Sequence, residues 1–149
     1  MRIYLDHNAT TPVRAEVVQA MTQTLTDVYG NPSSGHAEGD AARARIEAAR
    51  DAVARCLGAS PSWVYFTAGA SEANNAVLMG LLEEGPGHLV TSNVEHPSVE
   101  EPAARLESAG MQVTRVPVDE EGLLTPEAIF AALRPDTRLV SLIWANNET

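Results

Sequence analysis

The stretch HLVTSNVEHPS, residues 88–98, decides the fold. Residues 88–92 have the composition of a short strand that is buried inside a parallel sheet. A polar loop follows, and then a predicted helix in which Ser98 and Glu101 stand at capping-box spacing, which places Pro102 within its first turn. A buried strand that leads through a short loop into a helix is the building block of α/β proteins, so we expect this fold class.

Helices and strands alternate on both sides of this stretch. The spacing of apolar residues predicts helices over residues 12–28, 36–57, 71–82, 98–109 and 125–133. Short β-rich runs predict further strands over residues 63–67, 111–116 and 138–144. The chain is therefore predicted to form helices packed around a mostly parallel sheet. No linker divides residues 13–149, whereas residues 1–12 precede the alternating pattern and are expected to belong elsewhere, as an N-terminal arm.

The composition excludes several classes of protein. The net charge of −10 argues against a nucleic-acid partner, because proteins that bind phosphate backbones usually present a basic face. The sequence has no run of about 18 apolar residues, so we expect no membrane span. Cys56 is the single cysteine, which rules out an internal disulfide and is typical of a reducing compartment. We therefore expect a cytoplasmic protein.

Residues 66–72, FTAGASE, are the first candidate for a ligand site, because a predicted strand runs through a glycine turn into a helix. The first turn of a helix offers unpaired N–H groups and a partial positive charge, which together suit a phosphate. Gly69 would let the backbone approach the anion, and the Ser71 hydroxyl would add a donor. The alternative is that Ser71 is only an N-cap and Gly69 only turns the chain, and the local pattern by itself favours this alternative.

Two further candidates follow predicted strands. His96 comes after the strand at residues 88–92, and Asn146 and Asn147 come after the strand at residues 138–144. Ligands of open α/β sheets bind outside the carboxyl ends of the strands, and a histidine there can face a ligand ring or transfer a proton. The alternatives are a histidine in an exposed loop or at a helix end, and asparagines that form turns.

A metal site and a cysteine nucleophile are both poorly supported. The four histidines show no ligand spacing. Cys56 falls inside a predicted helix with nothing nearby to activate its thiol. We expect neither type of site.

Five segments together resemble the cysteine desulfurases, and within that family the NifS/IscS branch. They are residues 4–12 (YLDHNATTP), 30–34 (GNPSS), 66–72 (FTAGASE), 95–96 (EH) and 146–149 (NNET). They follow the order and the spacing of the family along the whole sequence. The one departure within these segments is Ser71, where many members of the branch have Thr; the hydroxyl is retained.

This resemblance implies a fold-type I enzyme that uses pyridoxal 5'-phosphate (PLP) and is related to the class V aminotransferases. Such enzymes remove sulfur from L-cysteine, giving L-alanine and an enzyme-bound persulfide that supplies iron–sulfur cluster or thio-cofactor assembly. Position by position, the resemblance implies that Ala70 and Ser71 bind the PLP phosphate. It also implies that His96 stacks on the pyridine ring and assists proton transfer, and that Asn147 binds the ring hydroxyl.

The resemblance further implies that part of the machinery lies outside these 149 residues. The family's Schiff-base lysine, the aspartate beside the pyridine nitrogen and the acceptor cysteine all belong beyond Thr149, and this sequence contains no lysine. We therefore expect an incomplete fragment, the first part of a large PLP-binding domain, inactive alone. The complete protein is expected to be a homodimer that serves a sulfur-acceptor or scaffold protein. Two alternatives stay open, a related enzyme such as a selenocysteine lyase and a non-catalytic half-domain that needs a partner chain.

Overall fold

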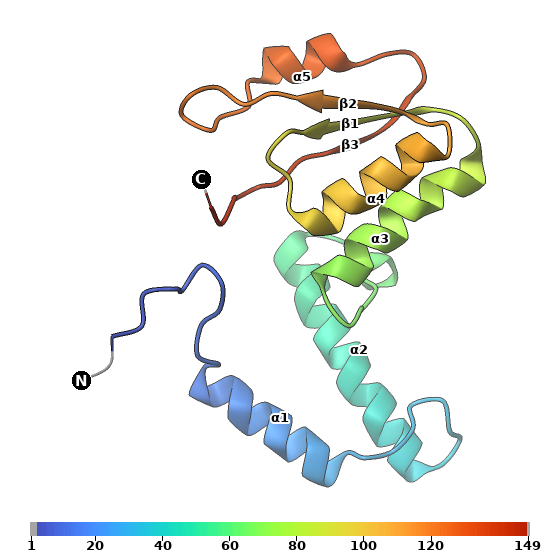
Figure 1. Ribbon diagram of the computed structural model, residues 1–149. Coiled ribbons are helices and arrows are strands. Elements are labelled where there is room, and N and C mark those ends of the chain that lie inside the picture. The colour runs from blue at the N-terminus through green and yellow to red at the C-terminus, as the bar shows by residue number, and fades with distance from the viewer. Residues whose placement is uncertain (1–2, 149) are drawn as a thin grey trace. The chain divides into compact units, whose positions relative to one another are not determined.

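The computed structural model describes residues 3–148, except for the side chain of Glu84. The chain forms two compact units that divide between Phe66 and Thr67. The first unit contains helices α1 (Ala15–Asp27) and α2 (Ala37–Leu57), and the second contains the sheet (Figure 1). Among the described residues, no helix has the length and apolar character needed to cross a membrane.

Three parallel strands form the sheet in the order β2-β1-β3. They are β1 (His88–Ser92), β2 (Gln112–Val116) and β3 (Thr137–Ser141). Strand β1 is central, and Leu89 pairs with Val113 on one side and with Leu139 on the other. Every residue of β1 is buried, which explains why its sequence does not alternate between apolar and polar residues. The predicted parallel sheet is confirmed.

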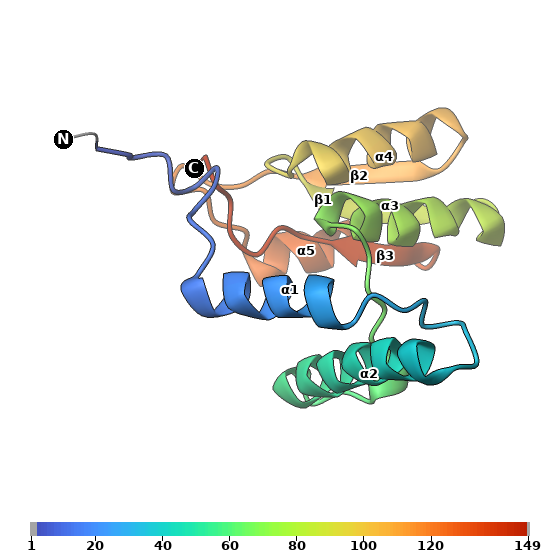
Figure 2. The ribbon, with the colours of Figure 1, turned by 90° about the horizontal axis from the view of Figure 1, so that it is seen from below.

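Helices cover both faces of this sheet. Helices α3 (Ala70–Gly80) and α4 (Pro97–Ser108) lie on one face, and α5 (Pro126–Ala132) lies on the other (Figures 1 and 2). The core lies between the sheet and the pair α3 and α4. Its buried members are Leu78, Leu81, Leu89, Val99, Ala103, Leu106 and Met111. Burial of each fully covered leucine stabilises the fold by about 1.5–3 kcal/mol.

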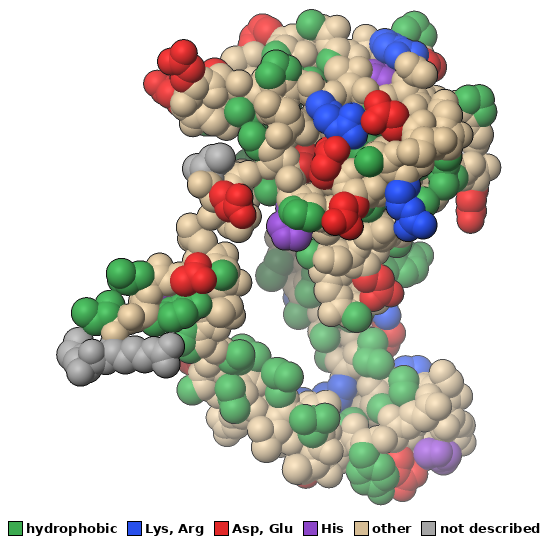
Figure 3. Space-filling model, in the orientation of Figure 1, with side chains coloured by type: hydrophobic (Ala, Val, Ile, Leu, Met, Phe, Trp, Pro, Cys, Tyr) green, Lys and Arg blue, Asp and Glu red, His purple; other side chains and the backbone are tan. Residues whose placement is uncertain are grey.

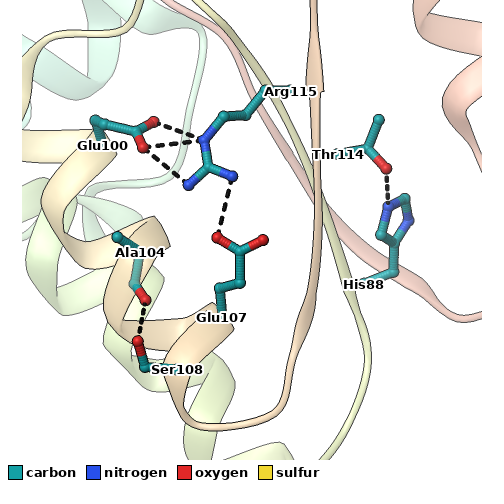
Figure 4. Close-up of polar contacts among 7 residues, drawn as sticks. All are labelled: His88, Glu100, Ala104, Glu107, Ser108, Thr114 and Arg115. Atoms are coloured by element: carbon teal, nitrogen blue, oxygen red, sulfur yellow. Dashed lines mark hydrogen bonds and ion pairs between the residues drawn. The ribbon is translucent and has the colours of Figure 1, made fainter.

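An ion-pair cluster fastens α4 to β2 (Figure 4). The Arg115 guanidinium donates to the Glu100 carboxylate at 2.9 Å and to the Glu107 carboxylate at 3.2 Å. The hydrogen bond to Glu100 is the main reason that the pKa of Arg115 is raised. The helix is thereby held against the strand at two points along its length.

His88 joins all three strands through its imidazole. Its Nε2 lies 2.8 Å from Thr114 Oγ1 on β2, as Figure 4 shows, and its Nδ1 lies 2.8 Å from Thr137 Oγ1 on β3. The side chain is fully buried, and this burial, together with the nearby Arg134 cation, lowers the pKa of His88. We therefore take the ring as neutral at pH 7, with one nitrogen donating and the other accepting.

The first unit is helical. The imidazole of His36 caps the first turn of α2 by accepting the Gly39 N–H, and Gly58 ends the helix in the left-handed conformation at φ 63°. This C-cap was predicted from the sequence. Large apolar side chains along α1 are exposed, among them Val17, Met21 and Leu25, and green side chains follow this helix in Figure 3.

Several predicted boundaries differ from the structure. The predicted strand at residues 63–67 is wrong, because Pro61–Trp63 form a 3₁₀ turn (η1) and residues 64–67 join no strand. The Arg50 guanidinium instead binds the Val64 carbonyl and lies 5.2 Å from the centre of the Phe66 ring. No described strand pairs with residues 64–67, so their backbone stays outside the sheet.

The other differences are smaller. Helix α1 begins three residues after Pro12, with Arg14 as its N-cap, and β3 ends at Ser141 rather than Trp144. Helix α3 ends at Gly80, and a 3₁₀ turn, η2 (Leu81–Glu84), follows it. The spacing of apolar residues predicts the ends of helices and strands least well, because the terminal residues are only partly held by the hydrogen bonds of the element.

Candidate functional site

One cavity lies at the carboxyl ends of the strands, in the unit that contains the sheet. The first turn of α3, the loop that follows β1 and the segment that follows β3 all border it. Its volume is about 390 Å³. It is lined by Ala70, Ser71, Asn74, Glu95, His96, Ser98, Val99, Ser141, Leu142, Ile143, Ala145 and Asn147. The four residues that the sequence singles out, Ala70, Ser71, His96 and Asn147, therefore border the same space.

The first turn of α3 presents unpaired N–H groups beside this cavity. Gly69 is the N-cap, no side chain caps the turn, and no described residue accepts the N–H of Ala70 or Ser71. The alternative in which Ser71 is the N-cap is therefore wrong, because Ser71 lies inside the first turn. The Glu72 carboxylate reaches back to the Ala68 N–H at 2.6 Å, which fixes the approach of the chain to the helix. Donors in this arrangement suit an anion.

Gly69 leaves room in front of these donors. Its backbone is fully extended, at φ 174° and ψ 175°, which any residue can adopt. A Cβ atom added there would meet no atom within 4 Å. Neither backbone strain nor packing thus demands glycine at this position. The space around Gly69 is open, so a ligand can approach the start of α3 without meeting a side chain there.

His96 is the N-cap of α4. Its Nδ1 accepts the backbone N–H of Ser98 at 3.0 Å, and Pro97 occupies the first position of the helix. The predicted capping box of Ser98 and Glu101 is therefore wrong, since the helix starts one residue earlier and the imidazole itself supplies the capping acceptor. Because α4 begins at Pro97, Pro102 lies inside the helix rather than in its first turn.

Two hydrogen bonds connect the loop after β1 to the segment after β3. The Glu95 carboxylate accepts the Ile143 N–H at 2.9 Å, and the Asn146 side-chain amide donates to the Val94 carbonyl at 2.7 Å. These bonds hold together the two segments that carry His96 and Asn147. Of the asparagine pair, Asn146 therefore joins backbone segments and Asn147 borders the cavity. From sequence, a ligand contact and a turn were both open for this pair.

Sequence reasoning missed Glu95 and Asn74 as members of the site. Glu95 also accepts the Ser92 hydroxyl at 2.5 Å, and Asn74 donates from its amide to Ser98 Oγ at 2.9 Å. The one available signal was that Glu95 stands beside His96 in the Glu-His pair of the resemblance. Asn74 lies inside a predicted helix, where a polar residue gives no sign of which neighbour it meets.

The site has the features that a phosphorylated aromatic cofactor requires. The α3 N–H groups and the Ser71 hydroxyl suit its phosphate, and the His96 imidazole and the Asn147 amide suit a polar ring. The cavity is large enough for a ligand of this kind. No group of three or more histidine, cysteine, aspartate or glutamate residues that would suit a metal occurs within residues 3–148.

Comparison with known proteins gives one consistent family. The family described as Aminotransferase class-V matches residues 3–149. The cysteine desulfurase IscS of Dictyoglomus turgidum is 44% identical over 149 residues, which are 98% of this chain and 38% of that protein. The selenocysteine lyase of Xenopus tropicalis is 41% identical over 165 residues, covering 99% of this chain and 38% of that protein.

The fold leads to the same family. The structure of a NifS-like protein matches this chain with a TM-score of 0.92 and 38% sequence identity, over 99% of this chain and 42% of that one. The predicted fold, the first part of a PLP-dependent enzyme of this kind, is confirmed by this match. The chain spans about two fifths of the length of the proteins that it matches.

Proposed function

Because this chain belongs to the aminotransferase class-V family, we propose that it forms the cofactor-contacting part of a cysteine desulfurase. The enzyme would use PLP to remove sulfur from L-cysteine, giving L-alanine and an enzyme-bound persulfide. The observation that carries this proposal is the convergence of Ala70, Ser71, His96 and Asn147 on one cavity of about 390 Å³. The relative named as a cysteine desulfurase, 44% identical over nearly the whole chain, supports this choice of reaction.

In this proposal the first turn of α3 holds the cofactor phosphate. The backbone N–H groups of Ala70 and Ser71 and the Ser71 hydroxyl act as donors, and the helix dipole adds a favourable potential. Acidic residues outnumber basic ones among residues 67–149, and red side chains are spread over this unit in Figure 3. An anion must therefore be held by local donors rather than by the field of the whole protein.

His96 and Asn147 would orient the ring. The imidazole packs against it and holds a proton that can be exchanged with the substrate, and the Asn147 amide donates to the ring hydroxyl. When bound, PLP supplies the electron sink on which the reaction depends. The two segments that carry these side chains are tied together by the Glu95 and Asn146 hydrogen bonds, so their relative positions are set before a ligand arrives.

Other parts of the complete enzyme are proposed from the family alone. The sequence contains no lysine, so the lysine that holds PLP covalently and the cysteine that receives sulfur would come from outside these 149 residues. We propose residues 1–12 as an arm toward a small domain and residues 13–149 as the first part of the large domain. Residues 1 and 2 of that arm lie outside the described residues. A homodimer, a sulfur-acceptor or scaffold protein as partner, and a cytoplasmic location complete the proposal.

A binding experiment on this chain tests the cofactor site. Pyridoxine 5'-phosphate lacks the aldehyde of PLP and cannot react with an amino group, so it reports non-covalent binding alone. We expect calorimetry to show that it binds at least tenfold more tightly than pyridoxine, which lacks the phosphate. Equal affinities for the two compounds would refute the phosphate site.

The reaction requires a second test. The chain can replace the matching 38% of the Dictyoglomus turgidum enzyme in a chimera, which is assayed for alanine and sulfide with L-cysteine and for selenide with L-selenocysteine. Turnover of L-cysteine is expected. Activity on selenocysteine alone would favour a selenocysteine lyase, and a folded chimera that binds PLP without turnover of either substrate would favour a non-catalytic half-domain.

A further inference from the structure

We infer that Asn74 is a positioning residue that acts through Ser98 to fix the ring orientation and the tautomer of His96. The three side chains form a chain of hydrogen bonds along one wall of the cavity, and each of them lines it. The inference deepens the proposed function and rests on it only for the role of His96 toward the cofactor. The hydrogen bonds among the three side chains are observed in the structure and do not depend on the proposed function.

The contacts connect two helices and a loop. The Asn74 amide on α3 donates from Nδ2 to Ser98 Oγ on α4 at 2.9 Å. Ser98 Oγ lies 2.9 Å from His96 Nδ1, and the backbone N–H of Ser98 donates to the same nitrogen at 3.0 Å. The imidazole is thus held by two groups of Ser98, and one of those groups is itself held by Asn74.

The directions of these bonds decide the tautomer. The backbone N–H of Ser98 can only donate, so this bond favours a lone pair on His96 Nδ1, and a hydroxyl that donates to the same nitrogen strengthens that preference. In the neutral ring the hydrogen therefore lies on Nε2. The Asn74 amide also only donates through Nδ2, which leaves the hydrogen of the Ser98 hydroxyl for His96 Nδ1. The Asn74 amide then donates to Ser98, and both groups of Ser98 donate to the His96 imidazole.

The consequence is that His96 offers an N–H from Nε2 rather than a lone pair. In the proposed enzyme the imidazole would meet its ligand as a proton donor at Nε2. The same helix would perform two tasks, because the first turn of α3 holds the phosphate and Asn74, one turn further along, orients the imidazole. A small shift of α3 would therefore change both contacts together.

Reversing the polarity of Asn74 gives the sharpest test. In N74D, the new carboxylate accepts the Ser98 hydroxyl, whose oxygen then presents lone pairs to His96 Nδ1 and favours a hydrogen there. The matched control is N75D, which adds the same charge to the next residue of α3. The Asn75 amide donates to the Ser71 carbonyl of its own helix rather than to Ser98, so N75D adds the charge without entering the hydrogen bonds that lead to His96.

Long-range ¹H–¹⁵N NMR of the ring nitrogens, above the pH at which histidine ionises, measures the tautomer directly. We expect the hydrogen of His96 mainly on Nε2 in the parent chain and in N75D. In N74D the ratio of the Nε2–H to the Nδ1–H form should fall at least threefold. A parent ring with its hydrogen mainly on Nδ1, or an unchanged ratio in N74D, would overturn the inference.

A second variant covers the case in which N74D does not fold. S98A removes the hydroxyl but keeps the backbone N–H that caps α4, and the same threefold fall in the ratio is expected, whereas an unchanged ratio again overturns the inference. Pyridoxine 5'-phosphate binding, measured on the same samples, separates the two proposals. If the tautomer ratio changes as expected but the parent chain binds no pyridoxine 5'-phosphate, only the proposed function is refuted. If the parent chain binds the compound but the ratio is the same in the variants, only the role of Asn74 is refuted.

Discussion

The Glu95 carboxylate accepts the backbone N–H of Ile143 at 2.9 Å, and this bond spans two strand ends that are separated by nearly fifty residues. Parallel strands bring their carboxyl ends to one edge of a sheet, but the loops beyond those ends are free to diverge. Glu95 prevents this divergence, because the same oxygen also accepts the Ser92 hydroxyl at 2.5 Å. The cavity is therefore defined by a carboxylate that has no place in the proposed chemistry.

Replacing Glu95 tests this view. E95A leaves the Ile143 N–H and the Ser92 hydroxyl without their shared acceptor, and we expect it to lower the free energy of unfolding by about 1–2 kcal/mol. E95Q keeps one oxygen acceptor and should lose less than half as much. Denaturant unfolding measures both, with E121A, an exposed glutamate in a turn, as control. Equal losses in E95A and E121A would contradict the role of Glu95.

Substitution of Gly69 should change anion binding without changing the stability of the fold. Because its backbone is extended and a Cβ atom meets open space, G69A should leave the stability unchanged. The added methyl group would, however, take up open space at the start of α3, where the phosphate is proposed to approach. We expect the affinity for pyridoxine 5'-phosphate to fall by roughly tenfold, a loss of about 1.4 kcal/mol of binding free energy, as measured by calorimetry.

The control for this substitution is G80A, at the end of the same helix. Its added Cβ also meets no atom within 4 Å, and the exchange of glycine for alanine within a helix stabilises it by about 0.5–1 kcal/mol. G80A should therefore raise the stability and leave the affinity unchanged. If both variants reduce the affinity alike, the phosphate is not held at the first turn of α3.

Buried His88 should make the stability of the sheet depend on pH. Its folded-state pKa is lowered by burial and by Arg134, so the unfolded chain binds the proton more readily. Stability is then fully present above the unfolded value of about 6.5 and is lost as the pH falls below it, by at most about 1.4 kcal/mol for each pH unit. Hydrogen exchange of the β1 amides between pH 5 and about 7.5 measures this slope.

A His88→Leu chain is the control for the pH effect, and we expect its slope to be flatter over the same range. The titration of Asp136 does not contribute to the slope measured in this pH range. Its pKa is lowered by the hydrogen bond from Arg134, so its contribution is present above its unfolded value, about 3.8, and is lost only at more acidic pH. An identical slope in the two chains would show that His88 is not the titrating group.

The sequence predicts this molecule best where local chemistry and the fold agree. The buried strand at residues 88–92 and the left-handed cap at Gly58 are both found, because each depends on residues that are adjacent in sequence. The predicted strand at residues 63–67 is not found, because Pro61–Trp63 form a 3₁₀ turn and no described strand pairs with the residues that follow. Apolar composition does not show whether a neighbouring strand is available for pairing.

The same contrast holds for the site. Ala70, Ser71, His96 and Asn147 were found through short motifs, and the fold places them around one cavity. Asn74 and Glu95 were missed as contributors because they act through contacts that span more than twenty residues in sequence. Motifs identified groups that line this cavity, whereas the residues that hold those groups in place emerge only from the packed structure.

Ser71 offers the most direct test of the hydroxyl in the first turn of α3. S71A removes one donor to a charged phosphate and keeps the helix, so the affinity for pyridoxine 5'-phosphate should fall by roughly three- to tenfold, or about 0.7–1.4 kcal/mol. S71T keeps a hydroxyl on the same carbon and should retain the affinity within about twofold. S108A, in the last turn of α4, is the control for losing a serine. If S71A and S71T lose equal affinity, the hydroxyl is not the group that binds the phosphate, and only the backbone N–H groups remain as donors to the anion.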